Sequence, residues 1–444
     1  MRRPGWAGAS RRGGARRRIH SLTLLPRCSQ YYVQITAGTP AQYMNVILDT
    51  GSADLVLATS PCTGCETTTT LYSANRSTTS SELGTSFSIT YGTGSASGTL
   101  VTDLVSIGGL NVSGTTIAAC TTVDDLLTES YESGLLGMGW KALATSGATP
   151  LLEQLYNSGA LDEPVFGMAF AGWADDSLAY DAAEHGGMLS IGGVNPYLYS
   201  GSISYISLTG TTYWSIPLED ITINGVSLGI SFDSCIIDSG TTLISIPAAD
   251  VATVYAKITG STASGSLMLY PSSANVSLSM QFGGITYNVS DFSFGQASAT
   301  QNYGIIYDAS AGTSTSQCII GDAFLKSVYS VFSFDPPAVG FATLDNTNNE
   351  LEDGTEPTAV ASAGVAQATV ASGATATGSA GVIVGGPVTV GGAGVSRTSS
   401  RGASSTGETK SGASSTSGCS PVGQGLGVGA VLALVAAAAG AHLV

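Results

Sequence analysis

Histidine is nearly absent from this 444-residue chain, which contains His20, His185 and His442 only. Between residues 30 and 345, where the composition is that of a folded protein, only His185 remains, in the polar segment AEHGG, which we expect to be a loop. A serine or cysteine nucleophile activated by imidazole would have to use this residue, and no HExxH or related zinc pattern occurs. The sequence therefore argues against imidazole-based catalysis and against a histidine zinc site.

Charged residues are also few, at 10% of the chain, and the two signs are separated. Eight of the 15 basic residues are arginines within residues 1–27, which contain no acidic residue. The rest of the chain carries seven basic and 31 acidic residues, a net charge of −24. This charge disfavours nucleic acid as a partner. It suits a protein that works in acid, where many carboxylates are protonated, and equally an ordinary soluble protein with an acidic surface.

The arginine-rich residues 1–27 lack the continuous apolar run of a secretory signal, since SLTLLP is too short to serve as one. An organelle transit peptide would match the lack of acidic residues, but it conflicts with the features of the C-terminus described next. We interpret this segment as a processed leader or a mis-assigned start, with the true signal and any pro-segment missing from the sequence.

The C-terminal part divides into a stalk and an apolar tail. Residues 346–424 are mostly Gly, Ala, Ser and Thr after a short acidic hinge, and lack the large side chains that offset ordering entropy. Residues 425–444 contain no Asp, Glu, Lys or Arg. Small residues ahead of such a tail are typical of a glycolipid-anchor signal, with Ser414 or Ser415 as the attachment residue. A retained membrane span is the alternative, since about 20 apolar residues can cross a bilayer.

Four N-x-[ST] sequons accompany this tail and are glycosylation acceptors if the chain is exported. Together with the tail they favour an oxidising, extracellular compartment and attachment to a membrane or wall at the cell surface. Anchor cleavage near Ser415 would also remove Cys419 and leave six cysteines, an even number. The four sequons begin at Asn75, Asn111, Asn275 and Asn288.

Short apolar bursts and alternating patterns fill residues 30–345, as in YYVQITAG, SFSITYG and SVYSVFSFD, with Gly, Ser, Asn and Pro between them. This spacing predicts a chain made mainly of β-strands. The clearest helix is predicted in TPLLEQLYNSGAL. There Thr149 is expected as the N-cap, Pro150 as the first helical residue, Leu151, Leu152 and Leu155 on one face, and Gly159 as the stop.

Two segments share one sequence pattern, in which apolar residues are followed by Asp, a hydroxyl residue, Gly and a second hydroxyl residue. They are ILDTGSADL at 47–55 and CIIDSGTTL at 235–243. A single D-[TS]-G is weak evidence, because Asp and Gly are common in turns. However, each is followed by an apolar-apolar-Gly triplet, ending at Gly137 and at Gly321. The repeat predicts two similar lobes whose Asp loops meet in one central cleft.

These motifs, in this order, resemble those of pepsin-like aspartic endopeptidases of the fungal, glycolipid-anchored, yapsin-like type. The resemblance covers residues 31–345 and includes GTPAQ, ITYGTGSASG, GLLGMG, DEPVFGMAF, GGMLSIGGVN and IIGDAFLKSVYSVF. It implies an all-β-dominated, bilobal fold with two pseudo-symmetric lobes, at 28–205 and 206–345, and few short helices. It also implies a peptide or protein substrate, no cofactor and no metal, and nothing in the sequence demands more than a monomer.

The resemblance makes Asp49 and Asp238 the catalytic pair. Amide hydrolysis without a covalent intermediate needs a base to draw a proton from water and an acid to protonate the substrate. Two carboxylates that share one proton supply both, because neighbouring carboxylates cannot both ionise cheaply. Activity is therefore expected to be greatest in acid.

The resemblance also assigns roles to the residues that follow each aspartate. Two hydroxyl residues would cross-link the loops through the backbone, and two more would hydrogen-bond the outer carboxylate oxygens. Two glycines would let backbone N–H groups approach the carboxylates, where a Cβ would crowd them. Ordinary turn chemistry is the alternative for each hydroxyl. The residues that would cross-link the loops are Thr50 and Ser239, and those that would bond the outer carboxylate oxygens are Ser52 and Thr241. The two glycines are Gly51 and Gly240.

SFSITYGTGSASGTLVTD predicts a hairpin with Phe87, Ile89 and Tyr91 on one face. The resemblance makes it the flap, with Tyr91 over the bound peptide and Gly92 and Thr93 offering main-chain contacts; an ordinary exposed hairpin is the alternative. Pepsin-like enzymes commonly have Trp shortly after the first D-T-G, where its indole N–H holds the flap tyrosine. Val56 occupies that place and cannot donate a hydrogen bond, so flap geometry and substrate preference are expected to differ.

PCTGC would be half of a zinc site only with a second C-x-x-C, which the chain lacks. We predict a local disulfide between Cys62 and Cys65 and a second-lobe bridge between Cys235 and Cys318, because each pair flanks a motif of the resemblance. The remaining two of the six cysteines, Cys28 and Cys120, are then the third pair, although six cysteines allow 15 connectivities.

Two further hypotheses compete with an active surface endopeptidase. One keeps the pepsin fold but has lost catalysis and acts as a surface binding protein, which the intact aspartate motifs and flap tyrosine disfavour. The other is a structural component of the cell wall, which the stalk and tail support but the motif-rich body does not.

Overall fold

The computed structural model describes residues 18–24, 31–92, 94–124, 126–127, 132–171, 184–308, 317–345 and 369–370. Strands dominate these ranges and the helices are short, which confirms the predicted all-β-dominated, bilobal fold class. Most of the predicted leader, stalk and tail lies outside the described residues. So do Cys28, Thr93, Ser414 and Ser415.

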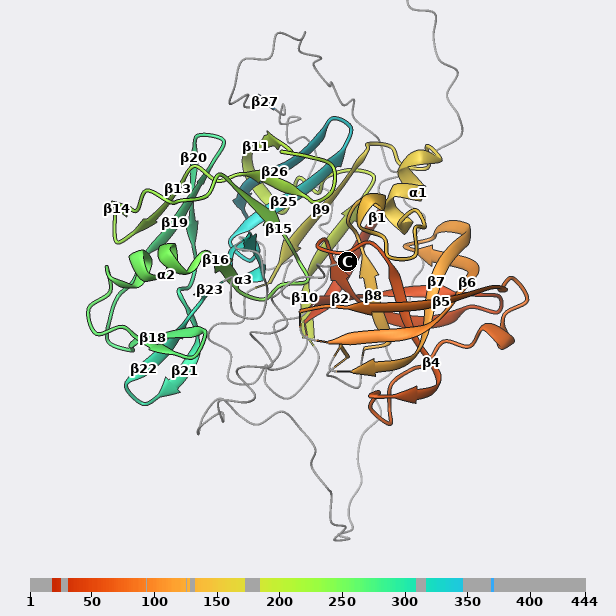
Figure 1. Cartoon of the computed structure of the whole chain (residues 1–444). Coiled ribbons are helices and arrows are strands. Elements are labelled where there is room, and N and C mark those ends of the chain that lie inside the picture. The colour runs from red at the N-terminus through yellow and green to blue at the C-terminus, as the bar shows by residue number, and fades with distance from the viewer. Residues whose placement is uncertain are drawn as a thin grey trace, which may run out of the picture.

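Fourteen strands of the described residues form one long sheet (Figure 1). Its order is β27-β11-β26-β25-β9-β10-β1-β2-β3-β8-β4-β7-β6-β5, so strands from both ends of the chain meet in it. The strands are β1 (Arg18–Leu24), β2 (Tyr31–Ala37), β3 (Gln42–Asp49), β4 (Leu55–Thr63), β5 (Ser81–Thr90), β6 (Ser95–Ile107), β7 (Leu110–Asp124), β8 (Gly134–Gly137), β9 (Val165–Phe170), β10 (Glu184–Ile191), β11 (Tyr199–Ser207), β25 (Val328–Phe334), β26 (Pro337–Leu344) and β27 (Thr369–Val370).

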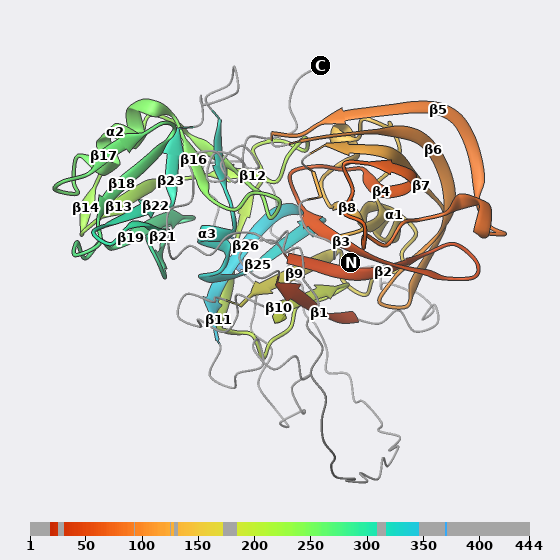
Figure 2. The same cartoon turned by 90° about the horizontal axis from the view of Figure 1, so that it is seen from below.

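Three smaller sheets build the other half of the described molecule (Figure 2). The first, β12-β15-β24-β16-β23, contains β12 (Ser215–Pro217), β15 (Ser234–Ile237), β16 (Ile244–Ile246), β23 (Ile306–Asp308) and β24 (Cys318–Ile320). The second, β14-β13-β19-β20, contains β13 (Asp220–Ile223), β14 (Val226–Ser227), β19 (Leu278–Phe282) and β20 (Ile285–Val289). The third, β17-β18-β22-β21, contains β17 (Thr262–Ser264), β18 (Leu267–Pro271), β21 (Ser293–Ser298) and β22 (Gln301–Gly304).

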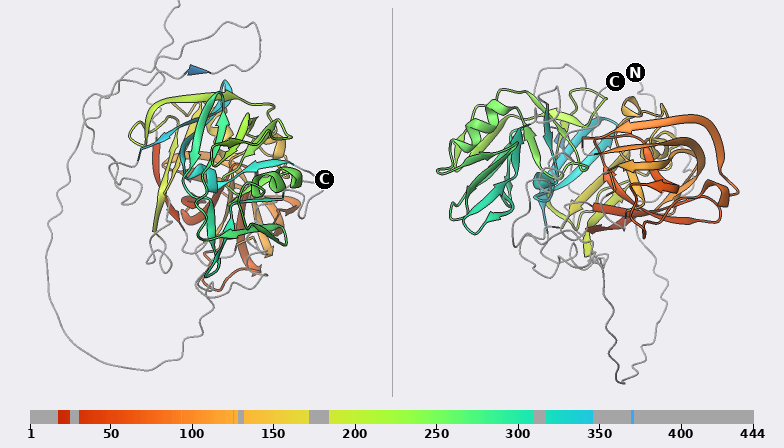
Figure 3. Two further views of the ribbon diagram at one scale, coloured as in Figure 1. Left: turned by 90° about the vertical axis from the view of Figure 1, so that its left-hand side faces the viewer. Right: turned by 60° about the horizontal axis from the view of Figure 1, so that its bottom comes forward.

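The two halves lie on either side of β9, β25 and β26, as Figure 2 and the right-hand view of Figure 3 show. The same pairing scheme occurs in each half. In the first, β3 runs parallel to β8, β8 antiparallel to β4, and β4 parallel to β7. In the second, β15, β24, β16 and β23 repeat these three relationships in the same order. Because β3 ends at Asp49 and β15 ends just before Asp238, the scheme places both aspartates equivalently.

The predicted helix is α1 (Leu151–Asn157), and its expected apolar residues Leu151, Leu152 and Leu155 are buried. Its start was predicted wrongly by one residue, because Pro150 has an extended ψ of 154° and is itself the N-cap, in place of Thr149. Gly159 lies beyond the end with a φ of +68°, as a helix stop requires. The other described helices are η1 (Ala74–Arg76), η2 (Lys141–Leu143), α2 (Ala248–Tyr255) and α3 (Asp322–Leu325).

Strand β1 inserts part of the arginine-rich N-terminal segment into the long sheet. It pairs antiparallel with β10 from Arg18, opposite Ile191, to Leu24, and its last two residues also pair with β2. The backbone of His185, which we expected in a loop, is therefore strand, because it pairs with Thr23. The paired residues lie between 160 and 173 positions apart in the chain, which is why the polar local sequence did not reveal this pairing.

The buried core runs continuously from one half into the other, and Trp214 lies at the junction. Its ring is fully buried and packs at 4.7 Å from Trp140, and against Phe166 and Phe332 at 5.8 and 5.3 Å. The indole N–H donates to the carbonyl oxygen of Met138, 3.0 Å away. Since the Met138 N–H in turn donates to the carbonyl oxygen of Asp49, this tryptophan ties the second half to the first aspartate loop.

Replacing Trp214 by Phe should lower the free energy of unfolding by about 1–3 kcal/mol more than replacing Trp140 by Phe. Both changes remove a similar volume, but the first leaves the Met138 carbonyl without its donor. The Trp140 indole N–H has no hydrogen-bond partner among the described residues, so its removal breaks no bond. Urea unfolding of both variants measures the difference, and equal losses would show that the Trp214 hydrogen bond contributes nothing.

Candidate active site

Asp49 and Asp238 face each other from the ends of equivalent strands, and each side chain is only 6% exposed. The glycine that follows each one lies against the opposite carboxylate. A Cβ on Gly51 would lie 2.6 Å from the Asp238 carboxyl carbon, and a Cβ on Gly240 would lie 2.4 Å from Asp49 Oδ1. Only glycine therefore fits at these positions, and the two carboxylates share one confined site.

Each carboxylate is held by the same two hydrogen bonds. The Gly51 N–H donates to Asp49 Oδ1 at 2.8 Å, and the Gly240 N–H donates to Asp238 Oδ1 at 2.8 Å. The Ser52 hydroxyl donates to Asp49 Oδ2, and the Thr241 hydroxyl donates to Asp238 Oδ2 at 2.6 Å. In each carboxylate, Oδ1 thus accepts a hydrogen bond from a backbone N–H and Oδ2 accepts one from a hydroxyl, which fixes the orientation of both carboxylates.

Thr50 and Ser239 join the two loops by crossed hydrogen bonds. The Thr50 hydroxyl donates to the Ile237 carbonyl at 2.9 Å and accepts from the Ser239 N–H at 2.9 Å. The Ser239 hydroxyl donates to the Leu48 carbonyl at 3.0 Å and accepts from the Thr50 N–H at 3.2 Å. The two loops therefore satisfy each other's buried backbone groups.

The pKa of Asp49 is raised well above the ordinary range of an aspartate, first by burial and then by the nearby Asp238 charge. Hydrogen bonds from Ser52 and Gly51 stabilise the charged form and oppose this rise only in part. The Asp49 carboxyl thus keeps its proton at a pH where an exposed aspartate has lost it, which gives the site a proton donor.

Tyr91 lies at the tip of the β5–β6 hairpin, next to this site. The side chains of Phe87, Ile89 and Tyr91 share one buried cluster, as the alternating pattern predicted, and the Tyr91 N–H donates to the Gly94 carbonyl at 2.7 Å. Burial raises the pKa of Tyr91 well above its usual value, and the charge of Asp49 raises it further. Gly92 is half-buried at the bend, and Thr93 lies outside the described residues.

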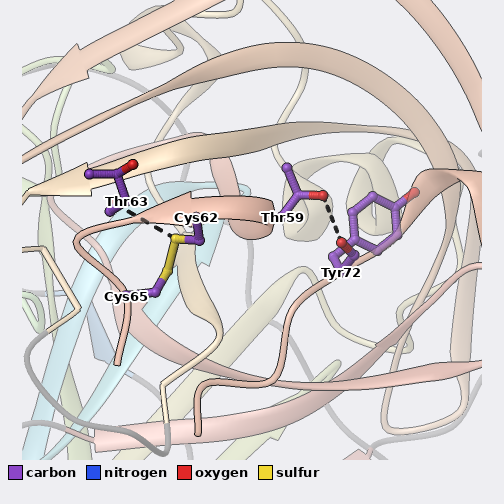
Figure 4. The surroundings of a disulfide bond; sticks show 5 residues. All are labelled: Thr59, Cys62, Thr63, Cys65 and Tyr72. Atoms are coloured by element: carbon purple, nitrogen blue, oxygen red, sulfur yellow. Dashed lines mark hydrogen bonds between the residues drawn. A yellow bond between two sulfur atoms is a disulfide. The ribbon is translucent and has the colours of Figure 1, made fainter. Parts of the chain in front are cut away.

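Two disulfides in the described part confirm the predicted pairs Cys62–Cys65 and Cys235–Cys318. The first closes a loop at the end of β4, near the hydrogen bond from the Thr59 hydroxyl to the Tyr72 carbonyl (Figure 4). The second joins β15 to β24, three residues before Asp238. Cys120 is buried and forms no disulfide within the described ranges, and Cys28 lies outside them, so their pairing stays a prediction.

Asp54 is a buried acidic residue of the site that the sequence analysis did not single out. Its carboxylate accepts hydrogen bonds from the Thr145 N–H at 2.8 Å, the Ser146 N–H at 3.2 Å and the Ser146 hydroxyl. Burial raises its pKa above the usual range, opposed by these donors. It ties the first aspartate loop to the segment before α1. The sequence signal that could have identified Asp54 is its position five residues after Asp49, within the motif ILDTGSADL.

The sequon residues Asn75, Asn111, Asn275 and Asn288 are all exposed. The described residues contain no cluster of three or more His, Cys, Asp or Glu side chains suited to a metal ion. Among the helices of the described ranges, none combines the length and the apolar character needed to span a bilayer.

Two buried aspartates that meet in one site from the ends of equivalent strands are typical of aspartic endopeptidases, and the site and the repeated frame define this class. Residues 30–344 match the family model described as eukaryotic aspartyl protease. The chain belongs to this pepsin-like family and is an aspartic-type endopeptidase, a hydrolase whose substrates are peptides or proteins.

The curated proteins that the chain resembles bear the names of aspartic peptidases as well. The chain is 39% identical to major aspartyl peptidase 1 of Cryptococcus neoformans, covering 73% of this chain and 70% of that protein. It is 32% identical to the aspartic protease of Phaffia rhodozyma, over 69% of this chain and 75% of that one. It is also 32% identical to rhizopuspepsin-2 of Rhizopus niveus, over 71% and 79% of the two chains.

Gly51→Ala should abolish activity and lower the free energy of unfolding by about 1–3 kcal/mol, because the new methyl group would overlap the Asp238 carboxylate. Gly210→Ala is the matched control, since a Cβ there meets no atom within 4 Å. Peptide cleavage and urea unfolding measured side by side test this. An active, fully stable Gly51→Ala protein would contradict the close approach of the two loops.

Asp49→Asn should raise the Tm at pH 7 and leave it nearly unchanged near pH 3. Because the folded-state pKa of Asp49 is raised, its contribution to stability is complete below the ordinary aspartate pKa and is lost as the pH rises through the raised one. Asparagine stays neutral and avoids this loss. Thermal unfolding across this pH range tests it, with the exposed Asp233→Asn as a control that should show no such gain.

Proposed function

We propose that Asp49 and Asp238 are the catalytic pair of this endopeptidase and activate one water molecule between them. The observation that carries this proposal is the reciprocal contact of each glycine with the opposite carboxylate, which confines both acids to one buried site. Burial and the nearby Asp238 charge raise the pKa of Asp49, which supports our assignment of the proton-donor role to this residue.

In this mechanism Asp238 takes a proton from the water while the water oxygen attacks the peptide carbonyl carbon. Asp49 gives its proton to the carbonyl oxygen, so that a neutral tetrahedral diol forms and no covalent bond to the protein is made. Asp238 then passes its proton to the amide nitrogen, the C–N bond breaks, and Asp49 recovers a proton from one hydroxyl of the diol. The pair returns to its starting state with a carboxylic acid and an amine as products.

The hydrogen bonds around the two aspartates support these roles of Asp49 as acid and Asp238 as base. Ser52 and Thr241 each donate to one carboxylate oxygen, and Gly51 and Gly240 each donate to the other, so neither carboxylate can rotate away. The crossed bonds of Thr50 and Ser239 keep the loops from separating under like-charge repulsion. Such preorganisation stabilises the transition state because no group has to reorient during the reaction.

Activity is proposed to be greatest in acid. The mechanism needs one proton on the pair, and burial together with the second carboxylate extends the pH range over which Asp49 keeps it. As the pH rises through the raised pKa of Asp49, the acid is lost and cleavage falls. At very low pH the base becomes protonated, so a bell-shaped profile is expected.

The β5–β6 hairpin is proposed to act as a flap over the substrate. Tyr91 is buried beside Asp49 and Ser52, where a peptide lying across the pair would pass beneath it. Gly92 and Thr93 would offer main-chain hydrogen bonds to that peptide. The lobes are proposed to comprise residues 28–205 and 206–345, with the substrate between them.

The enzyme is proposed to be a monomer that works outside the cell, held by a glycolipid anchor in the manner of yapsin-like proteases. Four exposed sequon asparagines and two disulfides suit the secretory route. The anchor would be attached at Ser414 or Ser415, with residues 346–424 as the stalk and 425–444 as the removed signal. Release of the protein from cells by a glycolipid-specific phospholipase tests this point, and retention after treatment would favour a peptide anchor.

Replacing either aspartate by asparagine should lower kcat/KM by roughly 10⁴-fold, because each carboxylate carries a proton that the transition state requires. The full chain, expressed behind a secretory signal, is assayed on a quenched-peptide library from pH 3 to 7, with and without a statine-type transition-state analogue. Asp233→Asn serves as the control, since this exposed residue precedes β15 and lies outside the pair.

Acid-optimal cleavage that Asp49→Asn, Asp238→Asn and the analogue all abolish is the expected result. Cleavage that survives in Asp49→Asn would disprove the catalytic assignment. A folded wild-type protein that cleaves no peptide would favour a surface binding protein with the same fold.

A further inference from the structure

The hydroxyl of Tyr307 is buried and has no hydrogen-bond partner among the described residues. Tyr307 lies in β23, and it is only 1% exposed. Burial raises the pKa of the phenol above its usual value, so the hydroxyl keeps its proton in acid and can donate a hydrogen bond. A buried donor without a partner weakens the folded state, so its presence calls for an explanation.

Strand pairing places Tyr307 on the same face of its sheet as Asp238. Directly paired residues have their side chains on one face, and side chains alternate between the faces along a strand. Tyr307 pairs with Ser245 of β16, and Ser245 is opposite Ile319 of β24 (Figure 1). Ile319 is opposite Ile236 of β15, and Asp238 follows Ile236 by two positions. We call Ile236, Ile319, Ser245 and Tyr307 the second-half row.

The opposite face of these four strands packs into the main core. Its residues pair in the same way and all belong to the core cluster; they are Ile237, Ile320, Ile244 and Ile306. In contrast, Ile236 and Ile319 belong to no buried apolar cluster of the described residues. Tyr307, in the edge strand, also contacts the core cluster, but its hydroxyl is close enough to Ser245 for that residue to favour ionisation of the phenol. The second-half row therefore lies beside Asp238, on the face turned away from the core.

The first half has an equivalent row, which the β5–β6 hairpin covers. In the same strand order its residues are Ile47, Leu135, Val56 and Ala118. All four share one apolar cluster with Phe87, Ile89 and Tyr91 of the hairpin. The first-half row is thus entirely apolar, whereas the second-half row has hydroxyl groups at its last two positions. The two sides of the site therefore offer different chemistry to a substrate.

A peptide at the aspartates would meet both hydroxyls of the second-half row. Ser245 and Tyr307 are buried in the free protein, but so is Asp238, so any peptide that reaches this carboxylate must first open the same face. The Tyr307 hydroxyl suits a side chain that accepts a hydrogen bond. The charge of Asp238 opposes ionisation of Tyr307 and would also repel an ionised carboxylate of the substrate. An amide oxygen accepts a hydrogen bond without carrying a charge.

We propose that Tyr307 and Ser245 determine specificity on the Asp238 side of the site by binding the amide side chain of a substrate glutamine. Tyr307 donates to the amide oxygen, and the Ser245 hydroxyl accepts from the amide N–H. The apolar Ile236 and Ile319 contact the two methylene groups of the glutamine. The proposal rests on the proposed function, because it concerns a peptide bound at the same two aspartates.

The test compares peptide substrates that carry either Gln or Met at each position on both sides of the cleaved bond. The two side chains have similar length, but only Gln forms these hydrogen bonds. Tyr307→Phe should lower the ratio of kcat/KM for Gln over Met about three- to tenfold at one position and leave the ratio unchanged elsewhere. Ser245→Ala should lower it at the same position. A ratio that Tyr307→Phe leaves unchanged at every position would overturn the proposal.

Tyr287→Phe is the matched control. It removes a hydroxyl from another buried tyrosine of the second half, where that hydroxyl donates to the Phe341 carbonyl at 3.3 Å. It should leave the Gln-to-Met ratio unchanged at every position. An equal fall of the ratio in Tyr287→Phe would mean that loss of any buried hydroxyl in this half alters specificity, and it would contradict the role of Tyr307.

Urea unfolding tests the premise without any need for activity. Tyr307→Phe should leave the midpoint unchanged or raise it, because the lost hydroxyl has no partner in the described residues, whereas Tyr287→Phe should lower it. A lower midpoint for Tyr307→Phe would show that its hydroxyl is already bonded within the free protein and would overturn the proposal.

Binding separates this proposal from the proposed function. If the wild type cleaves no peptide, its affinity is measured for statine-type analogues that carry Gln or Met on either side of the statine. A Gln-to-Met affinity ratio that falls in Tyr307→Phe would support the glutamine site although catalysis is absent. An unchanged ratio, or no binding of any analogue, would refute it.

Discussion

The crossed hydrogen bonds of Thr50 and Ser239 are the interaction on which the rest of the site depends. They join loops that are 189 residues apart in the chain and carry two buried carboxylates, which repel each other when both are charged. Four bonds satisfy the backbone groups that this approach buries, so the two loops stay together although they bring two carboxylates close to each other. The closeness of the two carboxylates therefore originates in hydrogen bonds that involve the backbone of both loops.

The two halves repeat one frame but secure it differently. In the first half, β3 and β8 belong to a long sheet, and Val46 pairs with Gly134 there. In the second half the equivalent positions are Cys235 and Cys318, joined by a disulfide in a sheet of short strands. A covalent link there compensates for fewer neighbouring strands. The surroundings of the aspartates differ as well, since Tyr91 of the β5–β6 hairpin lies near Asp49 and Tyr307 of β23 lies near Asp238.

Local patterns predicted much of this structure, and the failures have two causes, local backbone geometry and contacts with distant segments. The buried face of α1 and both described disulfides followed from nearby residues and motifs. In contrast, Pro150 in place of Thr149 as the cap, His185 in a strand and the insertion of β1 depended on backbone geometry or on pairing with distant segments. Asp54 was overlooked because its partners, Thr145 and Ser146, lie about 90 residues away.

The sequence by itself determined the class of enzyme, because two D-[TS]-G motifs, the near absence of histidine and a repeated apolar-apolar-Gly triplet leave little other chemistry for the two motifs to perform. Only the tertiary structure decided which groups surround the pair. That the Tyr91 hydroxyl has no hydrogen-bond partner among the described residues and that Trp214 ties Met138 to the second half both follow from strand order and packing. Such contacts join residues whose separation in the chain carries no signal of their closeness in space.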